Sequence, residues 1–122
     1  MRVAITGSAG LIGGIVYDHL SKQGHDLIGI DRPHEDWLKA GRNTDDENAR
    51  KRVDVEMDLT LISDEELSAA LEGTDCLIHL AADANPSNGD ESMIRNNIEP
   101  TTAIFRCAKS AQISRVIVAS SG

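Results

Sequence analysis

Three glycines near the N-terminus are spaced three residues apart. They lie in residues 6–13 (TGSAGLIG), which follow a short apolar run and open a segment with helical periodicity. Gly7 permits a sharp turn out of a strand, Gly10 leaves room for a pyrophosphate beside the backbone, and Gly13 allows the helix to pack closely on the sheet. In this context, between a strand and a helix, the glycines predict a dinucleotide-binding loop.

The first helical turn after the glycine loop completes the predicted phosphate site. Leu11 and Ile12 follow Gly10 directly, and the backbone amides at a helix N-terminus attract phosphate groups, as does the helix dipole. The spacing is G-x-x-G-x-x-G, which differs from the G-x-G-x-x-G of most dehydrogenases. A glycine-rich turn without a ligand is therefore the alternative interpretation.

A carboxylate ends the second apolar run, about 20 residues beyond the glycine loop, which is the spacing of a ribose-binding acid. Asp31 at this position can accept both ribose hydroxyls of an adenosine and repels a 2′-phosphate, so it favours NAD over NADP. Arg32 follows it and could stack on adenine or pair with a phosphate, which weakens that preference. The alternative for Asp31 is a solvated turn residue.

Five short apolar runs alternate with segments of helical periodicity. The predicted strands are Arg2–Thr6, Asp26–Asp31, Val53–Met57, Cys76–Leu80 and Arg115–Ala119. Such alternation predicts a parallel sheet that is covered on both faces. With right-handed crossovers, the expected fold is a doubly wound α/β (Rossmann) sheet with strand order 3-2-1-4-5, which ends after its fifth strand.

Helices are predicted between these strands. The first spans Leu11–Gln23, and its inward apolar face comprises Leu11, Ile12, Ile15, Val16 and Leu20. Ser63 and Glu66 have the spacing of a capping box, which begins a second helix that ends near Gly73.

A third helix is expected from about Asp90 to Ala111, with a kink or a fresh start at Pro100. Its apolar face includes Ile94, Ile98, Ile104, Phe105 and Ala108. Residues 32–50 are polar and are predicted to form a loop, with a helical turn around Trp37 and Leu38.

Bulk composition narrows the class of protein. The 122 residues predict one domain, residues 1–122, and the net charge of −8 disfavours nucleic acid and membrane surfaces as partners. Cys76 and Cys107 lack metal-type spacing and are expected to be reduced, partly buried side chains. With no predicted leader and no run of about 18 apolar residues, the expected location is the cytoplasm.

The motifs together resemble a known family, the extended short-chain dehydrogenase/reductases, or NAD-dependent epimerase/dehydratase enzymes. The matching features, in family order and spacing over the whole chain, are the glycine loop, the strand-ending Asp31, Asp58-Leu59, His79-Leu80-Ala81-Ala82, Asn97 and Ser120-Ser121. The resemblance implies NAD as cofactor, hydride transfer, and a small sugar or nucleotide-sugar substrate. It also allows for a homodimer.

The resemblance implies roles for the ends of the third and fourth strands. Asp58 and Leu59 would flank the adenine, with Asp58 bonding its amino group; a turn-forming aspartate is the alternative. Leu80, Ala81 and Ala82 would line the cofactor.

Asn97 and Ser121 also match the family, whereas we interpret the matching His79 as structural and not as functional. Asn97 would contact the cofactor or support the active site, with a structural hydrogen bond as the alternative, and Ser121 would be the catalytic serine, with a capping serine as the alternative. Strand alternation points His79 away from Leu80, so we interpret His79 as a packed side chain and not as a proton-transfer group.

The family's Tyr-x-x-x-Lys pair is absent from the chain, because its single tyrosine, Tyr17, has no lysine four residues later. We therefore expect an inactive N-terminal part of an NAD-dependent epimerase, dehydratase or dehydrogenase. Among these, a sugar or uronate dehydrogenase is weakly favoured. A non-catalytic NAD sensor or scaffold is the alternative of a different class.

Overall fold

The structure is a computed structural model that describes residues 1–38, 47–81 and 98–119. Its elements are β1 (Arg2–Thr6), α1 (Leu11–Lys22), β2 (Asp26–Asp31), the 3-10 turn η1 (His34–Asp36), α2 (Glu47–Lys51), β3 (Val55–Glu56), α3 (Asp64–Ala70), β4 (Cys76–His79), α5 (Glu99–Ser110) and β5 (Arg115–Val118). The five strands form one parallel sheet in the order β3-β2-β1-β4-β5, as the sequence predicts.

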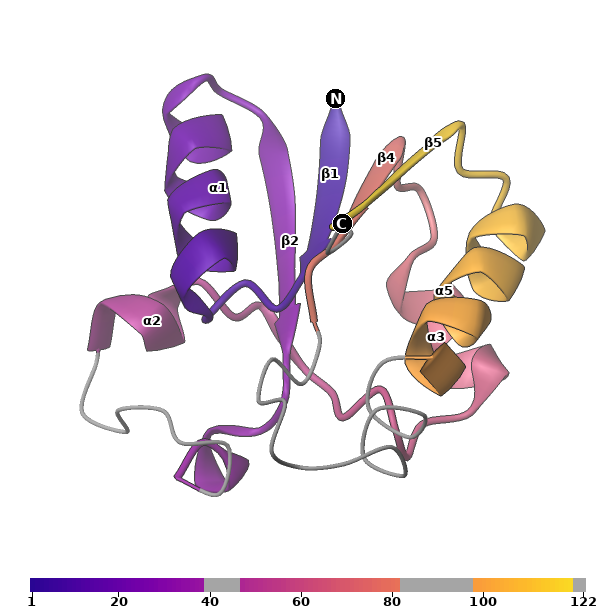
Figure 1. The fold of residues 1–122 in the computed structure, drawn as a ribbon. Helices are drawn as coiled ribbons and strands as arrows, with labels where there is room; N and C mark the ends of the chain where they lie inside the picture. Colours follow the sequence, from indigo (N-terminus) through magenta and orange to yellow (C-terminus); the bar gives the residue numbers. More distant parts are fainter. Residues whose placement is uncertain (39–46, 82–97, 120–122) are drawn as a thin grey trace.

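Helices cover both faces of this sheet. Figure 1 shows α1 on one side and α3 with α5 on the other. Beneath α1 lie Val3, Ile5 and Cys76, against which Val16, Tyr17 and Leu20 of the helix pack. The opposite face holds the larger aliphatic core, which comprises Ala4, Ile28, Ile30, Leu67, Leu71, Leu77, Ile104, Cys107 and Ala108. Both cysteines are buried and free, which confirms their interpretation as small core residues.

The strand register brings the predicted site residues to one edge of the sheet. Thr6 of β1 pairs with Ile30 of β2 on one side and with His79 of β4 on the other. The residues that come next along each strand direction, Gly7 and Asp31 among them, therefore emerge together at the carboxyl edge. This is the edge where open parallel sheets bind ligands.

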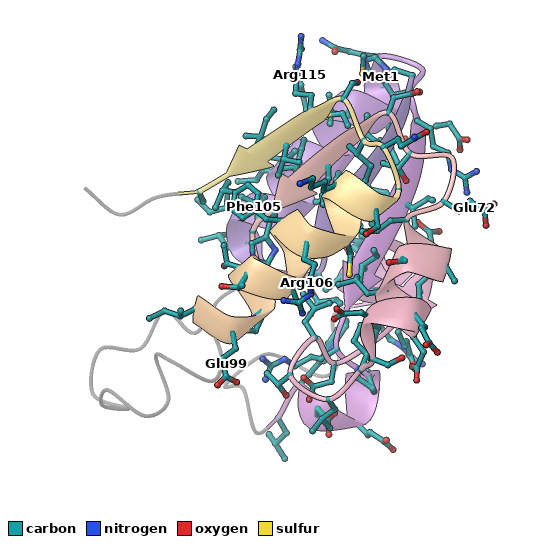
Figure 2. All side chains as sticks on the ribbon, turned by 90° about the vertical axis from the view of Figure 1, so that its right-hand side faces the viewer. Met1, Glu72, Glu99, Phe105, Arg106 and Arg115 are labelled. Carbon is teal, nitrogen blue, oxygen red and sulfur yellow. The ribbon has the colours of Figure 1, made fainter. Side chains whose placement is uncertain are left out.

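The two helices on the far face are tied together by an ion pair. Arg106 of α5 donates two hydrogen bonds to the carboxylate of Asp64, in the first turn of α3. Figure 2 views the molecule from this side and labels Arg106 on α5, with α3 beside it. The predicted cap of α3 is confirmed, because Ser63 Oγ accepts the Glu66 amide over 3.2 Å.

Three strands are shorter than predicted. β3 has two residues because the Asp54 side chain takes the Gly29 amide, at 2.7 Å, in place of a backbone carbonyl. β4 ends at His79, and the next amide, that of Leu80, is shared between the carbonyl and the hydroxyl of Thr6, over 3.2 and 3.0 Å. β5 ends at Val118.

The long connection after β2 also differs from the prediction. Its helical turn lies at His34–Asp36 and ends at Trp37, close to the predicted place. α2 was not predicted, since a five-residue helix with one buried side chain, Ala49, has too little apolar periodicity to be recognised.

The inward faces predicted for two helices were partly wrong. Leu11 of α1 is 84% exposed, and Ile12 and Ile15 are exposed as well, because Gly13 and Gly14 are the buried residues of this helix and its other face points outward. In α5, Ile98 and Phe105 are exposed, while Ile104 and Ala108 are buried as predicted. Cys107, three residues after Ile104, completes that buried face.

α5 begins at Glu99, with Pro100 in its first turn. Proline costs nothing there, because the first helical amides have no intrahelical acceptor. The part of the predicted helix from Asp90 to Asn97, which includes Ile94, lies outside the described residues. None of the helices in the described ranges is both long and apolar enough to span a membrane.

Candidate dinucleotide-binding site

The glycine loop is folded by its own backbone. Gly7 has φ +74°, a conformation that L side chains rarely adopt. Its amide donates to the Ile30 carbonyl over 2.8 Å, and its carbonyl accepts the Gly10 amide over 3.0 Å. A Cβ on Gly7 would stand 2.9 Å from the Ala81 nitrogen, so only glycine lets the ends of β1 and β4 approach this closely.

The helix that follows is seated on this turn. A Cβ on Gly13 would lie 1.9 Å from the Gly7 carbonyl oxygen, which excludes any side chain at that position. Gly13 does pack closely, but its partner is the backbone of the loop and not the sheet, which was the predicted partner. The loop and the first turn of α1 form one compact unit.

The N-terminus of α1 is open to an anion. Gly10 is the N-cap residue and supplies no capping side chain, and the first turn contains no acidic residue. No side chain caps the first amides of the helix, and the helix dipole adds a partial positive charge there. Leu11 and Ile12, both exposed, flank this end of the helix. Such a cradle fits a pyrophosphate.

Asp31 lies against this cradle. Its Oδ2 accepts the Ala9 amide over 2.9 Å, and its Oδ1 accepts the Arg32 amide over 2.8 Å. The side chain is 4% exposed, so the alternative of a solvated turn residue is wrong. Asp31 joins the end of β2 to the glycine loop, at the place where an adenosine ribose would meet a phosphate.

The end of β3 is closed by Asp58. Its Oδ1 accepts both the amide and the hydroxyl of Thr60, over 2.9 and 2.6 Å, so Asp58 does form the turn considered from the sequence. Those bonds leave Oδ2 without a partner among the described residues. The Leu59 side chain packs against the larger core.

The end of β4 is held by Thr6. Its hydroxyl oxygen accepts the amides of Leu80 and Ala81, over 3.0 and 3.1 Å, and lies 2.7 Å from Nδ1 of His79. His79 Nε2 lies 3.1 Å from the Thr101 hydroxyl. His79 is buried, and burial lowers its pKa to about 4. The interpretation of His79 as a packed side chain is supported, since both ring nitrogens have protein partners.

Three predicted site residues lie outside the described residues: Ala82, Asn97 and Ser121. The described ones, from Gly7 to Ala81, lie at or just after the carboxyl ends of β1, β2, β3 and β4. The sequence analysis overlooked Gly29, whose Cβ would lie 1.9 Å from the Arg52 carbonyl oxygen. An isolated glycine inside a strand is the signal that could have revealed this close approach.

Comparison with known proteins decides the family. The model of the NAD dependent epimerase/dehydratase family matches residues 3–122. The chain belongs to this family.

Two characterised relatives come from Haloferax volcanii. An L-arabinose 1-dehydrogenase (NAD(P)(+)) is 30% identical over 120 residues, which are 98% of this chain and 40% of that protein. An NAD-dependent glucose-6-phosphate dehydrogenase is 29% identical over 122 residues, which cover 98% of this chain and 42% of that protein. This epimerase/dehydratase-family chain thus spans about two-fifths of the length of the curated relatives that it matches.

A solved structure of a short-chain dehydrogenase/reductase superfamily protein from Agrobacterium tumefaciens, with bound NAD, is also similar. It is 29% identical with a TM-score of 0.74, and the match covers 100% of this chain and 33% of that protein. The shared fold extends over all the elements that build the candidate site.

Proposed function

We propose that this chain binds the adenosine diphosphate part of NAD across the carboxyl ends of β1 and β2. The observation that carries the proposal is the uncapped N-terminus of α1, placed beside Asp31 by the Ala9 hydrogen bond. The pyrophosphate would lie on the amides that follow Gly10, and the ribose hydroxyls would meet the Asp31 carboxylate. A carboxylate can accept several hydrogen bonds at once.

The remaining sites follow from the same placement. The adenine would lie between Asp58 and Leu59 and near Arg32, and the path toward the nicotinamide would run past Leu80, Ala81 and Ala82. Asn97 is proposed to contact the cofactor or to support the active site, and Ser121 to hydrogen-bond the substrate. Small side chains suit the crevice between β1 and β4, which must admit a dinucleotide.

We propose further that the protein carrying this chain is an oxidoreductase or epimerase that acts on a sugar or nucleotide sugar. Bound NAD supplies the hydride acceptor; the contribution of this chain is to hold and orient the dinucleotide. Both Haloferax volcanii relatives are named as dehydrogenases of a sugar or sugar phosphate, which favours a sugar dehydrogenase. An epimerase or dehydratase is the second candidate, because the family model includes both activities.

The test has two steps. Calorimetric titration of the protein that carries this chain should show that NAD binds and that NADP binds more weakly, because Asp31 would repel a 2′-phosphate. Asp31→Ala should reduce this difference in affinity between the two cofactors. NADH formation should then be measured with free sugars, sugar phosphates and nucleotide sugars. NAD binding without turnover on any sugar would favour a sensor or scaffold, and absence of NAD binding would contradict the proposal.

A further inference from the structure

The peptide that follows Asp31 is held from both sides. The Arg32 amide donates to Asp31 Oδ1 over 2.8 Å. The Arg32 carbonyl accepts the indole Nε1 hydrogen of Trp37 over 3.0 Å. Trp37, the single tryptophan of the chain, is 1% exposed, so this bond is shielded from water. The backbone of Arg32 is thus fixed by one side chain on each side.

Trp37 reaches its place through a short closed turn. The Asp36 amide donates to the Pro33 carbonyl over 2.8 Å, and the Trp37 amide donates to the His34 carbonyl over 3.1 Å. The rings of His34 and Trp37 meet edge to face, with centroids 4.8 Å apart. These contacts within residues 33–37 help to hold the indole in position.

A continuous chain of hydrogen bonds leads from this turn to the glycine loop. It runs from the indole of Trp37 through the Arg32 peptide to the carboxylate of Asp31, whose second oxygen accepts the Ala9 amide. The contacts that orient the carboxylate therefore include the phosphate cradle and the Arg32 peptide, which Trp37 anchors.

We infer that Trp37 is a positioning residue for cofactor selection at the ribose 2′ position, and that it acts through the Arg32 peptide on Asp31. This inference rests on the proposed binding of NAD at Asp31. A carboxylate that is held in place can both accept a 2′-hydroxyl and repel a 2′-phosphate, whereas one that can turn away does each less well. Selection by repulsion needs a group that cannot move aside, and a preordered acceptor loses less freedom on binding.

The test is the ratio of dissociation constants for NADP and NAD, measured by calorimetry. Trp37→Phe keeps an aromatic ring but removes the indole hydrogen-bond donor. This variant should lower the ratio about five- to tenfold, the size expected for one lost buried hydrogen bond. Most of the change should come from weaker NAD binding. A residue with only a structural role would weaken both ligands equally and leave the ratio unchanged.

A double-mutant cycle shows whether Trp37 acts through Asp31. In an Asp31→Ala background, Trp37→Phe should leave the ratio unchanged, because the carboxylate through which it acts is gone. Tyr17→Phe is the matched control: it removes a different side-chain hydrogen bond, to Asp54 over 3.3 Å, and should not change the ratio. If Trp37→Phe does not fold, His34→Ala, which removes the edge-to-face contact, should lower the ratio in the same direction.

The outcomes separate this inference from the proposed function. If the unmodified protein selects NAD and a folded Trp37→Phe or His34→Ala variant keeps the same ratio, the inference is overturned while the proposed function stands. An equal effect of Trp37→Phe with and without Asp31 also overturns it. If the unmodified protein binds neither cofactor, both the proposed function and the inference fail.

Discussion

The hydroxyl of Thr6 and the imidazole of His79 lie 2.7 Å apart at the carboxyl ends of the adjacent strands β1 and β4. The Thr6 oxygen already accepts two amides, from Leu80 and Ala81, so its single hydrogen points to His79 Nδ1. This assigns the ring hydrogen to Nε2, which faces the Thr101 hydroxyl. The ring is therefore neutral, and it links β1, β4 and α5 beside the proposed cofactor site.

Thr6→Val tests the hydrogen bonds made by the Thr6 hydroxyl. Valine has nearly the same shape, but it leaves the Ala81 amide and the Nδ1 nitrogen of His79 without the Thr6 hydroxyl. The Leu80 amide keeps the backbone carbonyl of residue 6, 3.2 Å away. We expect the free energy of unfolding to fall by about 2–4 kcal/mol, since each unsatisfied buried group costs about 1–3 kcal/mol before relaxation. Urea unfolding measures this loss. For Thr6→Ser, which keeps the hydroxyl, the free energy of unfolding should fall by about 1 kcal/mol. Equal decreases for the two variants would contradict the role given to the Thr6 hydroxyl.

The buried ring predicts a pH dependence of stability. Burial lowers the pKa of His79 to about 4 from the usual 6.5, so between these values the unfolded chain binds a proton that the folded chain does not. The stability that His79 contributes is complete above pH 6.5 and is lost as the pH falls toward 4. From pH 6.5 to pH 5 the loss should be about 2 kcal/mol.

His79→Gln provides the control for that pH dependence, because glutamine does not titrate. Urea unfolding should show that the free energy of unfolding falls between pH 7 and pH 5 in both proteins. The fall should be about 2 kcal/mol smaller in the variant than in the unmodified protein. Carboxylates and the other histidines contribute equally to both proteins and cancel in the comparison. Parallel profiles for the two proteins would show that His79 is not a buried neutral ring.

Two adjacent glycines of α1 should respond oppositely to alanine. At Gly13 the new Cβ would lie 1.9 Å from the Gly7 carbonyl oxygen, which is backbone and cannot move aside. We expect Gly13→Ala to lower the free energy of unfolding by more than about 3 kcal/mol, or to prevent folding. At Gly14 the nearest atom, 3.2 Å away, is the end of the Arg52 side chain.

Gly14→Ala is therefore the matched control. It should leave the free energy of unfolding unchanged or raise it by up to about 1 kcal/mol, because alanine has a higher helix propensity than glycine. Circular dichroism during urea unfolding measures both variants. A Gly13→Ala protein as stable as Gly14→Ala would show that the loop and α1 are not packed as described.

Gly10→Val should separate binding from folding. Gly10 has φ −74° and ψ 174°, which any residue can adopt, so valine causes no backbone strain there. Its side chain would stand where the pyrophosphate must approach. We expect NAD binding to weaken by more than about 100-fold, with little change in unfolding. Near-normal NAD affinity in folded Gly10→Val would place the phosphate site elsewhere.

Much of the architecture could be predicted because it depends on local pattern. Strand alternation with helices fixes a parallel sheet, handedness fixes its order, and the glycine spacing marks the phosphate loop between β1 and α1. The interior position of His79 also followed from alternation along a strand. These features depend on a residue's own neighbours in the chain, so one sequence suffices to predict them.

What the sequence could not determine depends on contacts between distant segments. The orientation of Asp31 depends on Ala9, 22 residues earlier, and the role of Thr6 depends on a histidine 73 residues later. Exposure of Leu11, Ile12 and Ile15 depends on which face of α1 is packed inward, the one that carries Gly13 and Gly14. Sequence alone determined the fold and the place of the loop; which donor meets which acceptor was decided only by the tertiary structure, because hydrogen-bond partners are set by three-dimensional packing and leave no periodic signal in the chain.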